Sequence, residues 1–184
     1  MSLLLPGIYG VAAAFSGAAI YANLPTRWTI GAVVPTVAHL KAASLVKIDD
    51  ENELQKDKAI SGSDFLAKPT MVMAVRRPGC ILCRREAAHV SDLKSLLDQA
   101  GVRLVAVVHE SKGVNDFKTY FNGTYTSMSA SKKEGFSGNT EGEGRLFGGV
   151  YFVDGDEMVW SHLEKEWGDK ADVGEARTAI EKYM

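Results

Sequence analysis

The chain has 184 residues and two cysteines, which suits one domain with a short appendage and excludes a small protein built on disulfides. Charged residues make up 24% and apolar residues 46% of the chain, which argues against a disordered chain or a multi-span membrane protein. The net charge of −2, from 21 basic and 23 acidic side chains, provides no global field for a nucleic-acid partner.

Residues 1–40 form an apolar leader in which no charged side chain precedes Arg27. Residues 7–24 consist mostly of Gly, Ala and larger apolar residues. As a helix they would span about 27 Å, just short of a bilayer core of about 30 Å. The segment is expected to be a membrane or interfacial anchor, or a soluble Gly/Ala-rich helix; a signal peptide would prefer a basic start. Basic residues follow this segment and none precedes it, so the domain is expected in the cytoplasm.

Residues 41–68 carry five lysines and six acidic residues and include a Ser-Gly-Ser sequence. This composition predicts a solvated, charged linker with short helical pieces. The folded domain is therefore expected to occupy residues 69–184.

A strand, a helix and a second strand are predicted next. Thr70–Val75 is a continuous apolar run, which is typical of a central strand buried on both faces. Apolar residues at helical spacing then predict a helix from about Cys80 to Ala100, which Gly101 ends. Val102–His109 is a second apolar run, so this part of the chain is expected to form a βαβ unit with a parallel sheet.

The remainder of the chain predicts a short helix at 114–121, a loop at 125–144, a hairpin and a last helix. Strands at 148–153 and 157–163 flank an Asp-Gly turn, which is a strong hairpin signal. The last helix is expected at 173–183. This order is that of an α/β, thioredoxin-like domain, a central sheet flanked by helices, here with an apolar N-terminal helix.

The two cysteines stand three residues apart, where the first strand gives way to the helix. Free N–H groups and the helix dipole favour a thiolate at Cys80. Residues 76–86 contain four arginines and one glutamate, and guanidinium groups favour the anion further. Cys83 lies one turn later on the same face, within reach of a disulfide. Cys80 is therefore predicted to be the nucleophile and Cys83 the resolving thiol, with Arg77 and Arg76 as the stabilising cations.

Two other interpretations of the cysteine pair remain open. A buried pair of cysteines can be inert, because free cysteine behaves as a small hydrophobic residue. A zinc site needs about four ligands, and the histidines are scattered and show no second paired motif: His39, His89, His109 and His162. Redox chemistry is the leading interpretation, and no bound cofactor or metal is expected.

Residues 74–84, Ala-Val-Arg-Arg-Pro-Gly-Cys-Ile-Leu-Cys-Arg, resemble the redox motif of the peroxiredoxin-like 2A family. This family is a branch of the thioredoxin-fold alkyl hydroperoxide reductase/thiol-specific antioxidant superfamily. Three further blocks are similar, at 135–144, 148–150 and 164–170, so that the resemblance covers about residues 70–184. It implies a thiol-based antioxidant protein whose redox-active centre is Cys80 and Cys83.

The chain departs from these relatives at two places. Arg77 stands three residues before Cys80, where ordinary peroxiredoxins have Thr or Ser to bind the peroxide. The segment between Tyr125 and Gly135 is shorter than in family members and lacks their apolar and aromatic residues. A wall of the substrate pocket or a membrane-facing surface is therefore expected to differ.

The expected function is the reduction of peroxides through a Cys80–Cys83 dithiol/disulfide cycle, with thioredoxin or glutathione as the external reductant. A sister branch, the prostamide/prostaglandin F synthases, suggests an endoperoxide as an alternative substrate. A third alternative is a non-enzymatic, membrane-tethered redox sensor that passes its disulfide to one protein partner. Catalytic turnover distinguishes the two enzymes from the sensor.

Overall fold

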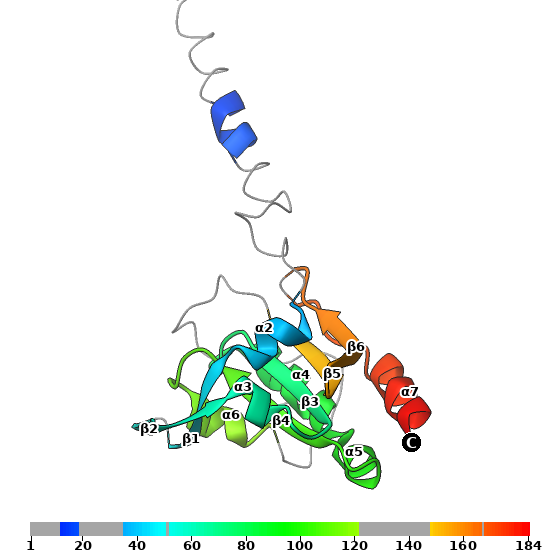
Figure 1. Cartoon of the computed structure of the whole chain (residues 1–184). Helices are drawn as coiled ribbons and strands as arrows, with labels where there is room; N and C mark the ends of the chain where they lie inside the picture. The colour runs from blue at the N-terminus through cyan, green and yellow to red at the C-terminus, as the bar shows by residue number, and fades with distance from the viewer. Residues whose placement is uncertain (1–11, 19–34, 51, 122–147, 167) are drawn as a thin grey trace, which may run out of the picture. The chain divides into compact units, whose positions relative to one another are not determined.

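The computed structural model describes residues 12–18, 35–50, 52–121, 148–166 and 168–184. The chain divides into two compact units, Met1–Val34 and Pro35–Met184. In the first unit the described residues, 12–18, are helical (blue in Figure 1). The rest of the expected anchor at 7–24 lies outside the described residues, so the apolar N-terminal helix is not shown. Within the described ranges, every helix is too short or too polar to cross a bilayer.

A four-stranded mixed sheet forms the centre of the second unit, in the order β4-β3-β5-β6. Its strands are β3 (Thr70–Val75), β4 (Arg103–Val108), β5 (Gly149–Asp154) and β6 (Glu157–Leu163). The prediction of a parallel sheet is correct only for β3 and β4, since β5 runs antiparallel to both β3 and β6. The Asp-Gly turn reverses the chain, which makes β5 and β6 an antiparallel hairpin. A βαβ unit followed by a hairpin and a helix is the thioredoxin-like arrangement.

The helix predicted from Cys80 to Ala100 is instead two helices, α4 (Ile81–Ser91) and α5 (Lys94–Gln99). The backbone N–H of Leu93 bonds the carbonyl of Val90 at 3.1 Å, an i to i+3 bond that tightens the chain between the helices. Val90, Leu93 and Leu97 are nevertheless all buried. The apolar spacing thus identified the buried face correctly but did not reveal the break.

The last helix, α7 (Val173–Tyr183), has the predicted bounds. It begins there because the Asp172 carboxylate accepts hydrogen bonds from the backbone N–H groups of Gly174 and Glu175, at 2.7 and 3.1 Å. In Figure 1, α7 lies alongside β6. The short helix α6 (Val114–Lys118) ends earlier than predicted. The loop expected at 125–144 lies outside the described residues.

Both faces of the sheet are covered, and alternate residues of β3 point into the two cores. On one face Met71 and Met73 pack with residues of α4, α5 and α7. On the other face Val72 packs with Val37 and Leu66, which belong to the segment before the sheet. The prediction that β3 is buried on both faces is therefore confirmed.

Residues 41–68 were expected to be a charged linker with short helical pieces, and this is wrong for most of the segment. After α2 (Val37–Lys41), the strands β1 (Ser44–Asp50) and β2 (Glu53–Ser61) form an antiparallel hairpin, which leads into the short helix α3 (Gly62–Phe65). The sequence did not predict this hairpin because its many charged residues interrupt the apolar alternation on which a strand prediction depends. The compact unit begins at Pro35, well before the expected start at residue 69.

Candidate active site

Cys80 occupies the N-cap of α4, immediately after the turn that follows β3. Its backbone N–H bonds the carbonyl of Arg77 at 3.0 Å, and its own carbonyl accepts the N–H of Arg84 at 3.0 Å. These two bonds close the turn and start the helix, so the backbone around the sulfur is held on both sides. The first-turn N–H groups of Leu82 and Cys83 favour the anionic form of the Cys80 sulfur.

The Arg76 guanidinium supplies the cation at this sulfur. Its Nη2 lies 3.2 Å from Cys80 Sγ, and the side chain is only 6% exposed. A charge-assisted hydrogen bond at this depth is screened little by solvent. The structure thus places Arg76, one of the two predicted stabilising cations, beside Cys80; its role in the chemistry stays a prediction.

The two thiols differ in their affinity for a proton. The Cys83 thiol donates a hydrogen bond to the Cys80 sulfur, which lowers the pKa of Cys80 despite burial; the N–H groups and Arg76 lower it further. The same hydrogen bond and burial raise the pKa of Cys83. Both cysteines are unpaired and buried, at 6% and 2% exposure. The arrangement favours a thiolate at Cys80, the more accessible of the two, with Cys83 as the protonated partner.

Arg77 contacts the cysteines through its backbone. Its carbonyl accepts the Cys80 N–H, and its own N–H lowers the pKa of Cys83. Arg84, from the same basic cluster, is buried and points elsewhere: its Nε donates to the Pro78 carbonyl at 2.9 Å. A stabilising role for the Arg77 side chain stays a prediction, while Arg84 holds the turn that carries Cys80.

Glu164 is a site residue that the motifs in the sequence do not single out. It follows β6 directly, is 5% exposed, and its Oε2 lies 3.8 Å from Arg76 Nε. Its backbone N–H bonds the Gly148 carbonyl at 3.1 Å. Gly148 has to be glycine because a Cβ there would lie 2.4 Å from the Ala74 carbonyl oxygen. The sequence signal was a carboxylate at the end of an apolar strand, inside one of the similar blocks.

A second buried carboxyl lies on α4 behind the cysteines. Glu86, three residues after Cys83, is 5% exposed and accepts the Ala171 N–H at 3.0 Å. Burial raises the pKa of Glu86 to about 7, and the nearby carboxylates of Glu164 and Asp169 add to this. Two buried carboxyl groups, those of Glu164 and Glu86, thus lie close enough to Arg76 to interact with its charge.

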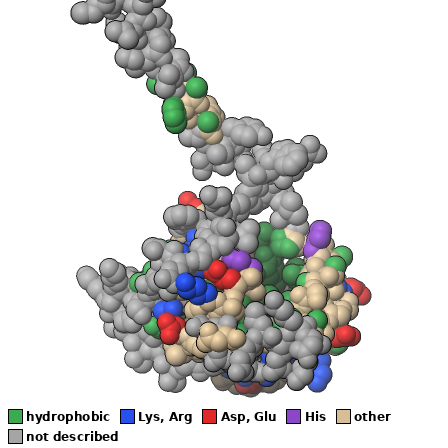
Figure 2. Space-filling view, turned by 90° about the vertical axis from the view of Figure 1, so that its left-hand side faces the viewer, with side chains coloured by type: hydrophobic (Ala, Val, Ile, Leu, Met, Phe, Trp, Pro, Cys, Tyr) green, Lys and Arg blue, Asp and Glu red, His purple; other side chains and the backbone are tan. Residues whose placement is uncertain are grey.

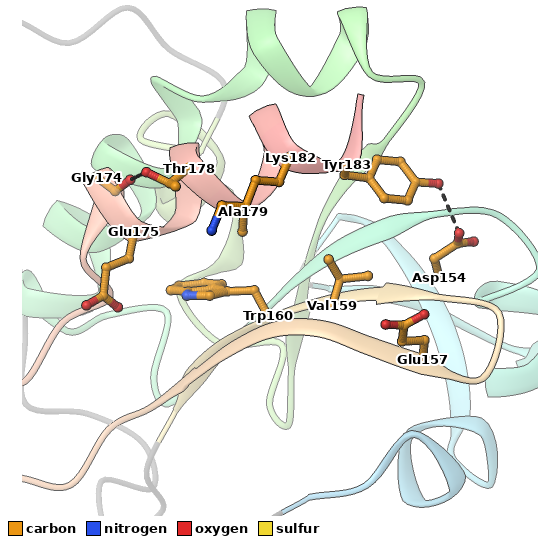
Figure 3. Close-up of a pocket in the computed structure, with 10 residues that line it drawn as sticks. All are labelled: Asp154, Glu157, Val159, Trp160, Gly174, Glu175, Thr178, Ala179, Lys182 and Tyr183. Carbon is orange, nitrogen blue, oxygen red and sulfur yellow. Dashed lines mark hydrogen bonds between the residues drawn. The ribbon is translucent and has the colours of Figure 1, made fainter.

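A separate groove of about 720 Å³ lies between β6 and α7. Figure 3 shows Trp160 on the strand side, with Glu175 and Lys182 reaching toward it from the helix. At one end the Tyr183 hydroxyl donates to Asp154 at 3.0 Å. Neither cysteine lines this groove, so it is separate from the sulfur chemistry.

Acidic and basic side chains are interspersed on the face shown in Figure 2, as the near-neutral net charge suggests. Within the described ranges, no group of three or more His, Cys, Asp or Glu residues could hold a metal ion.

No family model matches the chain, but proteins named Peroxiredoxin-like 2A do. The Xenopus tropicalis protein is 36% identical over 179 residues, covering 80% of this chain and 77% of that protein. The human protein is 34% identical over 204 residues, covering 94% and 88%. The Danio rerio protein is 33% identical over 209 residues, covering 97% and 96%. The chain belongs to the peroxiredoxin-like 2A family. Membership of this family supports a redox-related function.

The alignment with the Danio rerio peroxiredoxin-like 2A protein extends over 209 residues, more than the 184 of this chain. That relative therefore has residues without a counterpart here. The segment expected to be shorter, 125–135, lies outside the described residues. Among solved structures, MTB dsbF in its mixed oxidized and reduced forms is similar, with a TM-score of 0.47 and 17% identity, covering 83% of this chain and all of that one.

Proposed function

We propose that this member of the peroxiredoxin-like 2A family is a thiol peroxidase that cycles between a Cys80–Cys83 dithiol and a disulfide. The Cys80 thiolate attacks one peroxide oxygen, the O–O bond breaks, and the departing alkoxide or hydroxide takes a proton from solvent. Cys80 is oxidised to a sulfenic acid and the peroxide is reduced to an alcohol or water. The Cys83 thiol then displaces the sulfenic hydroxyl as water and forms the disulfide.

An external thiol closes the cycle. Thioredoxin, or two molecules of glutathione, supplies two electrons and two protons and returns both cysteines to the reduced state. A dithiol that must be reduced in every turnover suits a reducing compartment, so the proposed location is the cytoplasm.

The observation that carries this proposal is the 3.2 Å contact between Arg76 Nη2 and Cys80 Sγ at the N-terminal turn of α4. The thiolate is the nucleophilic form of cysteine, and this contact stabilises it. Once the O–O bond stretches, negative charge develops on the departing oxygen next to the same guanidinium. Arg76 is therefore proposed to act on both anions, with Arg77 assisting at the departing oxygen.

The burial of the sulfurs favours a small substrate over a protein partner. Exposures of 6% for Cys80 and 2% for Cys83 leave room for the approach of a hydroperoxide more readily than for a disulfide carried by another protein. Disulfide exchange with a protein, whether thioredoxin in the proposed cycle or the partner of a redox sensor, would require the site to open first. Burial therefore bears on the choice of oxidant and not on the choice of reductant. A prostaglandin-type endoperoxide would react through the same attack on an O–O bond, so only a substrate comparison separates it from a hydroperoxide.

The test is a coupled assay on the full chain. Hydrogen peroxide, an alkyl hydroperoxide and an endoperoxide are supplied in turn, with thioredoxin, thioredoxin reductase and NADPH, and with glutathione in a parallel series. Catalytic NADPH oxidation that depends on Cys80 supports a peroxidase, and the preferred oxidant identifies the substrate class. A single stoichiometric oxidation followed by a mixed disulfide with one protein would support the sensor instead.

A further inference from the structure

Arg76 faces two anionic groups at once. Its Nη2 lies 3.2 Å from Cys80 Sγ, and its Nε lies 3.8 Å from Glu164 Oε2. All three side chains are at most 6% exposed, so solvent compensates their charges poorly. The cation is thus shared between a sulfur whose charge changes during the redox cycle and a carboxyl whose position is set by the fold.

Oxidation changes this balance because a disulfide carries no charge. In the dithiol state the Cys80 thiolate is the nearer partner of Arg76, and a second anion at Glu164 repels the first. In the disulfide state the buried guanidinium needs another anion, and the Glu164 carboxylate is already in contact distance of it. The effect is reciprocal. Because the Glu164 carboxylate is more favourable in the disulfide state than in the dithiol state, an ionised Glu164 in turn stabilises the disulfide relative to the dithiol.

We propose that Glu164 competes with the Cys80 thiolate for Arg76 and thereby makes the Cys80–Cys83 disulfide harder to reduce. This inference rests on the proposed dithiol/disulfide cycle and assigns Glu164 as a positioning residue that tunes it. Oxidation by glutathione disulfide is balanced as follows: Cys80 thiolate and Cys83 thiol give the protein disulfide, one glutathione and one glutathione thiolate. The Cys83 proton goes to the first glutathione, and solvent protonates the second.

The surroundings of Glu164 agree with this role. Burial raises the pKa of the Glu164 carboxyl, whereas the Gly148 N–H and Arg76 lower it and the Cys80 and Asp169 charges raise it. Glu86 and Tyr151 also interact electrostatically with it. Among the described residues, the ionisable groups that act on Glu164 are Arg76 just after β3, Cys80 at the N-cap of α4, Glu86 of α4, Tyr151 of β5, and Asp169. Only Cys80 among them changes charge on oxidation, so the redox state of the site acts directly on Glu164.

The test measures the equilibrium of the full chain with reduced and oxidised glutathione at pH 7, for wild type and Glu164→Gln. Glutamine keeps the size of the side chain and an oxygen for the Gly148 N–H, but removes the competing charge. We expect the equilibrium constant to shift about tenfold toward the dithiol, the effect of removing one nearby like charge, and the Cys80 pKa to fall as followed by thiolate absorbance. Glu166→Gln, two residues away and exposed, is the matched control and should match wild type.

An unchanged equilibrium in Glu164→Gln, or a shift toward the disulfide with a higher Cys80 pKa, overturns the proposal; the second result would mean that Glu164 only holds Arg76 in place. If the variant does not fold, carbon NMR of wild type decides. The pKa of the Glu164 carboxyl should be lower in the disulfide than in the dithiol state, and an equal value overturns the proposal. If no intramolecular disulfide forms in wild type, the proposed function fails first, and that result is distinguishable from an unaltered equilibrium.

Discussion

Arg76 Nη2 and Cys80 Sγ lie 3.2 Å apart, one directly after a buried strand and the other at the N-cap of a helix. A tight turn brings them together, and the Arg84 side chain holds that turn through the Pro78 carbonyl. The thiolate therefore owes its stability to the junction of β3 and α4 as a whole.

Removing the cation should weaken the nucleophile. In Arg76→Met the Cys80 pKa should rise, because the sulfur loses its nearest positive charge. The midpoint of the pH dependence of Cys80 alkylation should rise by roughly one pH unit. At pH 4, close to the Cys80 pKa of about 4 in wild type, the rate should therefore fall about fivefold, while the rate at pH 8 changes little. The rate is followed by mass spectrometry of the peptide. The matched control is Arg177→Met, an exposed arginine on α7, which should alkylate like wild type; an equal rate in Arg76→Met would show that the contact does not stabilise the thiolate.

The pH dependence of alkylation should be unusually flat. The Cys80 pKa is lowered by the Cys83 thiol, the helix N–H groups and Arg76, so the thiolate persists well below the range of an ordinary thiol, near 8.5. Between pH 8 and pH 6 the folded chain should lose little rate, whereas denatured chain should lose well over tenfold. Because the folded pKa is depressed, the stability gained from this thiolate is present above the unfolded pKa and disappears as pH falls through the folded one. An alkylation rate that falls as steeply in the folded chain as in the denatured chain would contradict the lowered Cys80 pKa.

Replacing each of the two cysteines should stop the redox cycle at a different step. Cys80→Ser should abolish the reaction with peroxide, because the remaining thiol, Cys83, is more deeply buried, at 2% exposure against 6%, and burial still raises its pKa. Cys83→Ser should complete one oxidation and stop at a sulfenic acid, since resolution requires the second thiol. A sulfenic-acid probe and intact mass distinguish these states. The reverse pattern would make Cys83 the nucleophile.

The ionised Glu86 carboxylate should lower the free energy of unfolding at alkaline pH. Burial raises the pKa of Glu86 to about 7, so the cost of ionising it in the fold is absent below the unfolded value near 4.3 and complete above about 7. Glu86→Gln should therefore raise the free energy of unfolding by about 1–3 kcal/mol at pH 8 and leave it nearly unchanged at pH 4.5. Denaturant unfolding at both pH values provides the measurement. Glu157→Gln, which is exposed, should change neither value, and an equal gain for Glu86→Gln at both pH values would rule out an ionisation effect.

Membrane attachment, if residues 7–24 provide it, should be separable from the redox chemistry. Full-length protein should sediment with membranes and be released by detergent but not by salt, because the attachment would be apolar. A truncation should stop before Pro35, since Val37 of α2 is part of the core. Chain 35–184 should then remain in the supernatant and still form the disulfide. A full-length protein that stays in the supernatant would remove the anchor from consideration.

Local patterns in the sequence predicted the elements around the cysteines well. The apolar run at 70–75, the hairpin at the Asp-Gly turn and the helix at 173–183 each depend on neighbouring residues, and all three agree with the structure. The β1–β2 hairpin was not predicted because charged residues interrupt the alternation of apolar and polar residues from which a strand is predicted. The break between α4 and α5 was missed because it leaves the apolar spacing intact.

The candidate site was only half predictable for a related reason. Arg76 and the cysteines are within one short motif, so their proximity follows from sequence. Glu164 reaches Arg76 because β5 and β6 return to the end of β3, and such a contact between distant residues is defined by the topology of the sheet. Similarly, a run of arginines cannot show which one bonds sulfur and which one, like Arg84, bonds the backbone.

Peroxide titration of the reduced full chain, with mass spectrometry of the peptide that contains both cysteines, addresses the central claim directly. One equivalent of peroxide should yield a Cys80–Cys83 disulfide, detected as the loss of two hydrogens, and thioredoxin should return it to the dithiol over many turnovers. A chain that consumes no peroxide, or that remains a dithiol while oxidant is present in excess, would contradict the proposed cycle.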